Sequence, residues 1–150
     1  MERKRSDYSM TDVAVTLETY IRDGEESERM AFTEKGRFFT KGNMDVVTFT
    51  EYPEGRDPVD TMVTIKPGHV SIKRSGGVEM RQLFEPQAET QNTYVHEYGK
   101  MFMTTWTDSL EYQAPDAGAS GELFIEYQLT VNEDVTQKHK LKLTLEEETE

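Results

Sequence analysis

The sequence contains no cysteine, which excludes disulfides, zinc–thiolate centres and thiol catalysis. Basic residues are also few, since 17 lysines and arginines stand against 29 aspartates and glutamates and leave a formal net charge of −12. Binding to a phosphate backbone needs a basic surface, so we expect no nucleic-acid partner and no membrane partner. The acidic balance is typical of a protein kept in solution by its charge, or of one that binds a basic partner.

Long apolar runs are absent too, and no segment approaches the length needed to span a bilayer. The first residues, from Met1 to Asp7, are charged where a signal peptide would carry its apolar core, so we expect a cytoplasmic protein. The three histidines lie far apart in the sequence, and none has a second ligand at a spacing typical of metal sites. They are His69, His96 and His139. We therefore predict no metal site and no cofactor.

What the sequence does contain is alternation of apolar and polar residues, the pattern of β-strands that bury one face. Between Asp60 and Phe84, three short alternating segments are joined by Pro67-Gly68 and by Ser75-Gly76-Gly77, which predicts an antiparallel meander. Gly76 or Gly77 should then adopt a positive φ. Further alternating segments cover residues 12–22, 28–40, 45–52, 93–98, 122–131 and 138–145, and none shows helical spacing.

Two other glycines interrupt this pattern. Gly36 is interpreted as a bulge, and Gly99, a single residue too short for a hairpin loop, as a kink or bulge within one long strand. About nine or ten strands separated by turn signals predict an all-β fold, either a sandwich or a closed barrel. The short connections favour consecutive antiparallel pairing and therefore a single closed antiparallel barrel, which would also remove exposed strand edges. We expect the barrel to cover residues 12–147, with an N-terminal arm at 1–11 and an acidic C-terminal tail at 148–150.

Several polar residues share the phase of the apolar residues that would fill the barrel. They are Glu51, Arg74, Tyr94, His96 and Tyr127, with His139 as a further candidate. Because an isolated charge inside a barrel is costly, we predict that Arg74 pairs with Glu51. The group could form a satisfied internal network, an anchor for a ligand carboxylate, or an acid/base catalytic site.

The sequence therefore leaves the function open between three classes. The leading hypothesis is a non-enzymatic barrel that binds a small, partly apolar ligand, with a carboxylate as one option. The alternatives are a small acid/base enzyme using interior Tyr, Arg and Glu side chains, and an acidic adaptor for a basic protein. No residue is assigned a catalytic role, and a homodimer is a further option.

Two sets of strand and turn residues form a familiar pattern. The first is the run from Ile72 to Met80 with Phe84, Tyr94, Tyr98-Gly99 and Thr107, and the second is Gly121-Glu122-Leu123 with Tyr127-Gln128-Leu129. In this pattern the chain resembles the YwiB-like family of uncharacterised bacterial proteins, over about residues 12–147. The resemblance implies a lipocalin-like, calycin-type β-barrel. Since that family has no established activity, it implies no functional residue.

Overall fold

The computed structural model describes residues 10–96, 98–116, 120–132 and 135–148, and of His96 it describes the backbone only. These residues form ten β-strands. The strands are β1 (Thr11–Asp23), β2 (Glu26–Lys41), β3 (Met44–Glu51), β4 (Val59–Lys66), β5 (His69–Gly76), β6 (Glu79–Phe84), β7 (Ala88–His96), β8 (Gly99–Gln113), β9 (Gly121–Val131) and β10 (Val135–Glu147). Within the described ranges there is no helix that could span a membrane.

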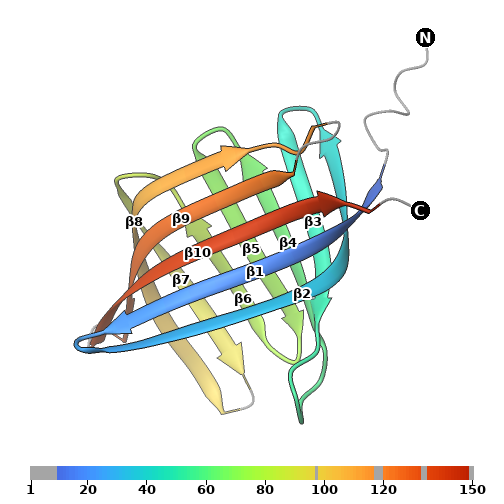
Figure 1. Ribbon diagram of the computed structural model, residues 1–150. Helices are drawn as coiled ribbons and strands as arrows, with labels where there is room; N and C mark the ends of the chain where they lie inside the picture. The colour runs from blue at the N-terminus through green and yellow to red at the C-terminus, as the bar shows by residue number, and fades with distance from the viewer. Residues whose placement is uncertain (1–9, 97, 117–119, 133–134, 149–150) are drawn as a thin grey trace.

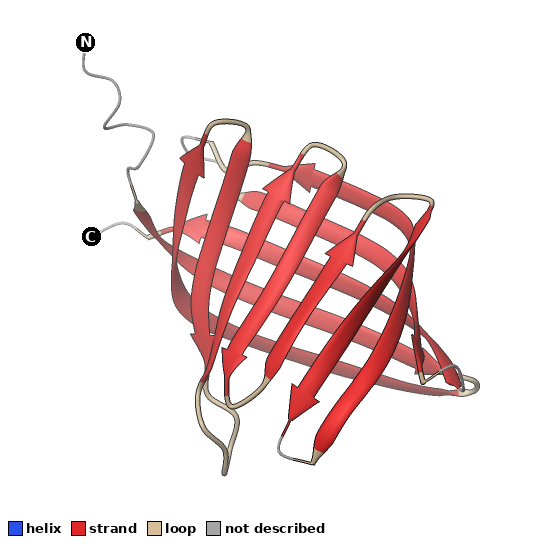
Figure 2. Ribbon diagram, turned by 180° about the vertical axis from the view of Figure 1, so that it is seen from behind, coloured by secondary structure: helices blue, strands red, loops and turns tan. Residues whose placement is uncertain are grey.

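Each strand pairs antiparallel with its neighbours in sequence, and β1 closes the ring by pairing with β10. Figure 1 shows β1, β2, β9 and β10 crossing one side of the barrel diagonally, with β3 to β7 on the other side. The same arrangement is seen from behind in Figure 2. The predicted closed antiparallel barrel of nine or ten strands is confirmed, with ten strands in the described residues.

The two ends of the barrel differ in what lies inside. At the end that carries the β2–β3, β4–β5 and β6–β7 turns, the interior is filled by apolar side chains that are almost completely buried. They include Val13, Val15, Val47, Val70, Phe84, Leu123, Ile125, Leu143 and Leu145. Each such side chain contributes roughly 1.5–3 kcal/mol when fully buried, so this half supplies most of the barrel's stability. We call it the closed end.

A hydrogen bond crosses the interior near the closed end. The Tyr112 hydroxyl on β8 donates to the carboxylate of Asp45 on β3, with an oxygen–oxygen distance of 2.7 Å. These two strands lie on opposite sides of the ring, so the bond braces the barrel across its width. Burial, followed by this hydrogen bond to a carboxylate, raises the pKa of Tyr112 well above its usual value.

The opposite end carries the β1–β2, β3–β4, β5–β6 and β7–β8 connections, and we call it the mouth. Inward-facing side chains become half-buried as each strand reaches this end, as at Thr19, Ile21, Met80 and Leu129. Along β5 the inward residues change from buried valine and isoleucine to Arg74. The interior is therefore apolar at the closed end and polar near the mouth.

Two glycine interpretations were wrong, and each has a physical reason. Gly36 forms no bulge: its pairing with β1 and β3 is regular, but an added Cβ would lie 2.6 Å from the Thr48 carbonyl oxygen and 2.8 Å from Val15. Gly99 forms no kink within a strand, because it pairs with His96 and opens β8 after a tight hairpin. No Asn-Gly or Pro-Gly pair marks that turn in the sequence.

The strand boundaries near this hairpin also changed. β7 begins at Ala88, five residues before the predicted alternating segment at 93–98, and it pairs with β8 from Ala88 onward. In the β5–β6 turn, Gly76 has the positive φ, at 110°, as expected for one of its two glycines. The predicted arm and tail lie mostly outside the described residues, whose strands run from Thr11 to Glu147.

Candidate functional site

Polar side chains from five strands gather inside the barrel toward the mouth. They are Glu51 of β3, Thr61 of β4, Arg74 of β5, Tyr127 of β9 and His139 of β10, and we call them the polar cluster. All five occupy inward positions, because they continue the alternation that buries their apolar neighbours. Thr61, Tyr127 and His139 are buried, whereas Glu51 and Arg74 are half-buried.

The centre of the cluster is an ion pair held by a threonine. Nη2 of Arg74 lies 3.2 Å from Oε2 of Glu51, so the predicted contact between these two residues is present. The Thr61 hydroxyl donates to the same carboxylate oxygen over 2.7 Å. Thr61 pairs across the sheet with both Arg74 and Phe49, which places its hydroxyl between the strands that carry the two charges. Nε of Arg74 is buried and makes no hydrogen bond within the described part of the chain.

On the opposite wall, Tyr127 packs between two rings. Its ring stacks on that of His139, with centroids 4.8 Å apart and planes inclined by 23°, and meets Phe84 edge-on at 4.9 Å. Burial raises the pKa of Tyr127 to about 12, and the positive charge of Arg74 opposes this shift. Burial and the charge of Arg74 are the two influences on this pKa, and no hydrogen bond to a described residue contributes to it.

His139 is a neutral imidazole in this setting. Burial lowers its pKa to about 4, because the interior disfavours the charged ring. Nε2 lies 3.2 Å from the amide oxygen of Gln137 and is therefore the nitrogen that carries the proton. Nδ1 is buried and has no partner among the described residues, which leaves an unused acceptor beside Tyr127.

A second polar network seals the wall where β6 and β7 diverge. These strands pair only from Glu79 to Arg81, and beyond that point side chains replace the backbone ladder. The Asn92 side chain accepts a hydrogen bond from the Leu83 amide over 3.0 Å, and the buried Gln82 amide donates to Thr105 over 3.0 Å. These hydrogen bonds satisfy buried polar groups where the backbone ladder between the two strands ends.

Two further sequence candidates, Tyr94 and His96, lie on β7. Tyr94 is half-buried on β7 and lies in the same cross-strand row as Arg74, separated from it by Met80 on β6. His96 ends β7, and its side chain lies outside the description. Thr61 was missed, although its phase with Val63 and Ile65 was a usable signal. In the described ranges no three His, Asp or Glu side chains are arranged to hold a metal ion.

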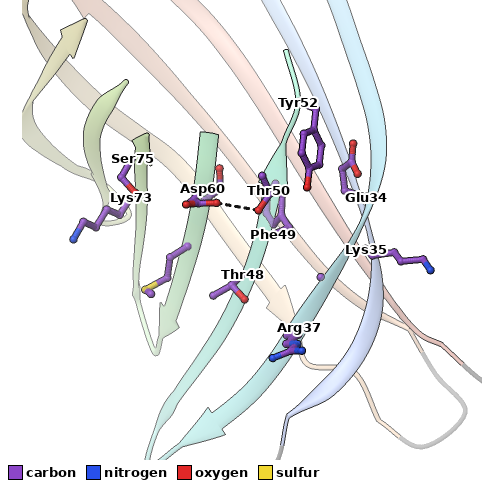
Figure 3. A pocket seen from close by; sticks show the side chains of 13 residues that line it. Glu34, Lys35, Arg37, Thr48, Phe49, Thr50, Tyr52, Asp60, Lys73 and Ser75 are labelled. Atoms are coloured by element: carbon purple, nitrogen blue, oxygen red, sulfur yellow. Dashed lines mark hydrogen bonds between the residues drawn. The ribbon is translucent and has the colours of Figure 1, made fainter. Parts of the chain in front are cut away.

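A groove of about 600 Å³ lies where β2 and β3 separate. Figure 3 shows Glu34 of β2 and Tyr52, which follows β3, on the same side of the groove, while Lys35 points away. The groove reaches Thr61 and Phe49, whose side chains also face the barrel interior. It therefore adjoins the polar cluster through Thr61.

The comparisons with known proteins agree with this architecture. Residues 15–143 match the model of a protein family described as a domain of unknown function, DUF1934. The chain is 27% identical over 138 residues to the uncharacterised β-barrel protein YwiB of Bacillus subtilis (strain 168), covering 91% of this chain and 94% of that protein. It also resembles the crystal structure of the YwiB protein from Bacillus subtilis, with a TM-score of 0.86, 25% identity and coverage of 97% and 98% of the two chains.

Proposed function

The chain belongs to the DUF1934 family of domains of unknown function, and we propose that it is a non-enzymatic barrel that binds a small, partly apolar carboxylate. The ligand would enter at the mouth and place its carboxylate on Arg74. The resemblance to lipocalin-like barrels, expected from the sequence, is part of this proposal. It accords with barrels of moderate strand number, which can hold one small ligand.

The observation that carries the proposal is the incomplete use of the Arg74 guanidinium. A guanidinium presents five N–H donors in a planar fork. Glu51 contacts Nη2, whereas the buried Nε has no acceptor among the described residues. A buried donor without a partner is unfavourable, and a carboxylate that binds Nε together with a neighbouring nitrogen would satisfy it.

The surroundings of Arg74 suit a ligand with one polar and one apolar part. The Tyr127 hydroxyl can donate a hydrogen bond to a carboxylate, whereas the Nδ1 acceptor of His139 can contact only a donor elsewhere on a ligand. Around the mouth, the half-buried side chains of Ile21, Met80 and Leu129 offer apolar contacts. Small-molecule sites commonly combine an apolar wall with a few polar groups in this way.

An acid/base enzyme is the second candidate, favoured by the meeting of Glu51, Arg74 and Tyr127. Efficient acid/base catalysis uses a group that titrates near the working pH. The pKa of Tyr127 is raised to about 12 and that of His139 is lowered to about 4, so neither group changes charge near neutrality. These shifts favour binding over catalysis.

Calorimetric titration with hexanoate, at constant pH and salt, tests the proposal. We expect measurable binding to the parent protein and at least about tenfold weaker binding to Arg74→Met, because the charged hydrogen bonds are lost. Arg81→Met is the matched control, since Arg81 is exposed on β6 and should not affect binding. Hexan-1-ol should bind much more weakly than hexanoate. Equal affinities of the parent and folded Arg74→Met would refute the proposal, as would equal binding of the alcohol.

A further inference from the structure

The barrel carries one long strand edge that no other described strand covers. β2 pairs with β1 from Glu26 to Phe38, but it pairs with β3 only from Gly36 to Lys41. Over residues 26–35, the backbone groups that point away from β1 therefore face the mouth without a ladder partner. An edge of this kind is a template for the addition of another strand.

The side chains on the inner face of this edge combine two apolar residues with two carboxylates. Met30 is 52% exposed, and Phe32 packs partly against Phe49 with ring centroids 6.1 Å apart. Glu28 and Glu34 flank them on the same face, because alternate residues of a strand point to the same side. The edge thus shows the order acidic, apolar, apolar, acidic along its inner face.

A second copy of the chain does not fit this edge. In a two-fold antiparallel pair, residues of the same face lie opposite each other, and like charges in that position are destabilising. Every register that uses most of the edge sets like charges opposite one another: Glu26 and Glu34, Glu28 and Glu34, Arg29 and Lys35, or Arg29 and its own copy. The charge pattern therefore disfavours self-pairing, a common protection of exposed edges.

We propose that the edge formed by residues 26–35 of β2 binds an extended segment of a basic partner protein, which pairs with it as an additional strand. Such a segment places basic residues opposite Glu28 and Glu34 and apolar residues opposite Met30 and Phe32. The net charge of −12 favours the approach of a basic chain. The groove beside Glu34 and Tyr52, seen in Figure 3, gives the added strand space where β2 leaves β3.

The probe is a fluorescein-labelled peptide, Lys-Thr-Val-Thr-Val-Thr-Lys, whose pattern reads the same in both directions. Fluorescence anisotropy should show saturable binding to the protein, at least about tenfold tighter than that of the peptide with glutamates in place of the lysines. In the double variant Glu28→Lys and Glu34→Lys this preference should reverse. The matched control is Glu111→Lys, an exposed site on β8 that should leave the preference unchanged.

Backbone methylation distinguishes strand pairing from simple charge attraction. Methyl groups on the threonine nitrogens block one edge of the peptide, and those on the valine and lysine nitrogens block the other. Strand addition predicts that only one of these two peptides loses binding. Equal loss or equal retention by both would overturn the proposal, as would an absence of saturable binding by the unmodified peptide.

Two further results would also overturn the proposal. One is that the folded double variant still prefers the lysine peptide to the glutamate peptide. The other is that the parent protein forms a dimer in sedimentation equilibrium and the double variant does not. The inference stands independently of the carboxylate site, because Arg74→Met should leave peptide binding unchanged.

Discussion

The ion pair between Arg74 and Glu51 allows a quantitative test of the interior, through the changes Arg74→Met and Glu51→Gln made singly and together. Methionine keeps much of the length of the arginine side chain without its charge. Glutamine keeps an oxygen that can still accept the hydrogen bond from Thr61. The two changes therefore remove the charge–charge contact while they leave the neighbouring contacts largely in place.

The burial of the pair sets the expected magnitude. Removing one partner of a fully buried pair costs about 3–5 kcal/mol, whereas exposed pairs contribute at most about 1 kcal/mol. The side chains of Arg74 and Glu51 are 31% and 19% exposed and lie 3.2 Å apart, which is between these limits. We expect each single change to lower the free energy of unfolding by about 1–3 kcal/mol, and a coupling energy of about 1–2 kcal/mol.

Urea denaturation of the parent, both single variants and the double variant gives this coupling energy directly. The control cycle combines Arg81→Met with Glu51→Gln, because Arg81 is exposed and makes no recorded contact with Glu51. That control should be additive. A coupling energy below about 0.5 kcal/mol between Arg74 and Glu51 lies within the ordinary error of additivity. Such a value would refute the claim that the two side chains stabilise the protein by pairing with each other.

Three other changes test the fold and its electrostatics. Gly76→Ala should lower the free energy of unfolding by more than about 1 kcal/mol, and by more than Gly77→Ala, because Gly76 has a φ of 110° and its Cβ would lie 2.6 Å from a backbone oxygen; equal urea midpoints would contradict this. Tyr112→Phe should cost about 1–2 kcal/mol by thermal or urea unfolding, because it removes the hydrogen bond to Asp45; no loss would show that the brace contributes little. The folded-state pKa of His139, about 4, lies below its unfolded value of about 6.5, so stability is lost as pH falls from 6.5 through 4. The parent should therefore lose about 2–3 kcal/mol more free energy of unfolding than His139→Phe between about pH 6.5 and about pH 4. Parallel plots of the free energy of unfolding against pH for the two proteins would contradict this.

The fold could be predicted largely because strand alternation and turn residues agree along most of the chain. The meander from β4 to β6 has apolar residues at most of its alternate positions and a Pro-Gly or Gly-Gly turn at each end of β5. The β7–β8 hairpin could not be found this way. Between His96 and Gly99, which pair with each other, the sequence has Glu97-Tyr98 and no typical turn-forming residue, so the alternating stretches on both sides were interpreted as one strand.

The candidate site could be predicted only in part, because phase along a strand indicates a face but not which residues meet across a barrel. The alternation of inward and outward residues along each strand predicted that Glu51 and Arg74 lie inside the barrel. The cost of burying an isolated charge then predicted that they pair. The stacking of Tyr127 on His139 follows from the β9–β10 register, which the turn between those strands determines. The sequence does not specify that register closely enough to predict which rings meet.

The divergence of β2 from β3 connects the two proposed sites. Gly36 lets β2 approach the Thr48 carbonyl closely, and beyond this point the strand continues with β1 alone. The same departure leaves the β2 edge without β3 next to the groove that reaches Thr61. A strand added at this edge would cover part of the mouth, so peptide binding and carboxylate binding should be coupled. Because such coupling is reciprocal, a saturating concentration of the basic peptide must change hexanoate affinity by the same factor that hexanoate changes peptide affinity.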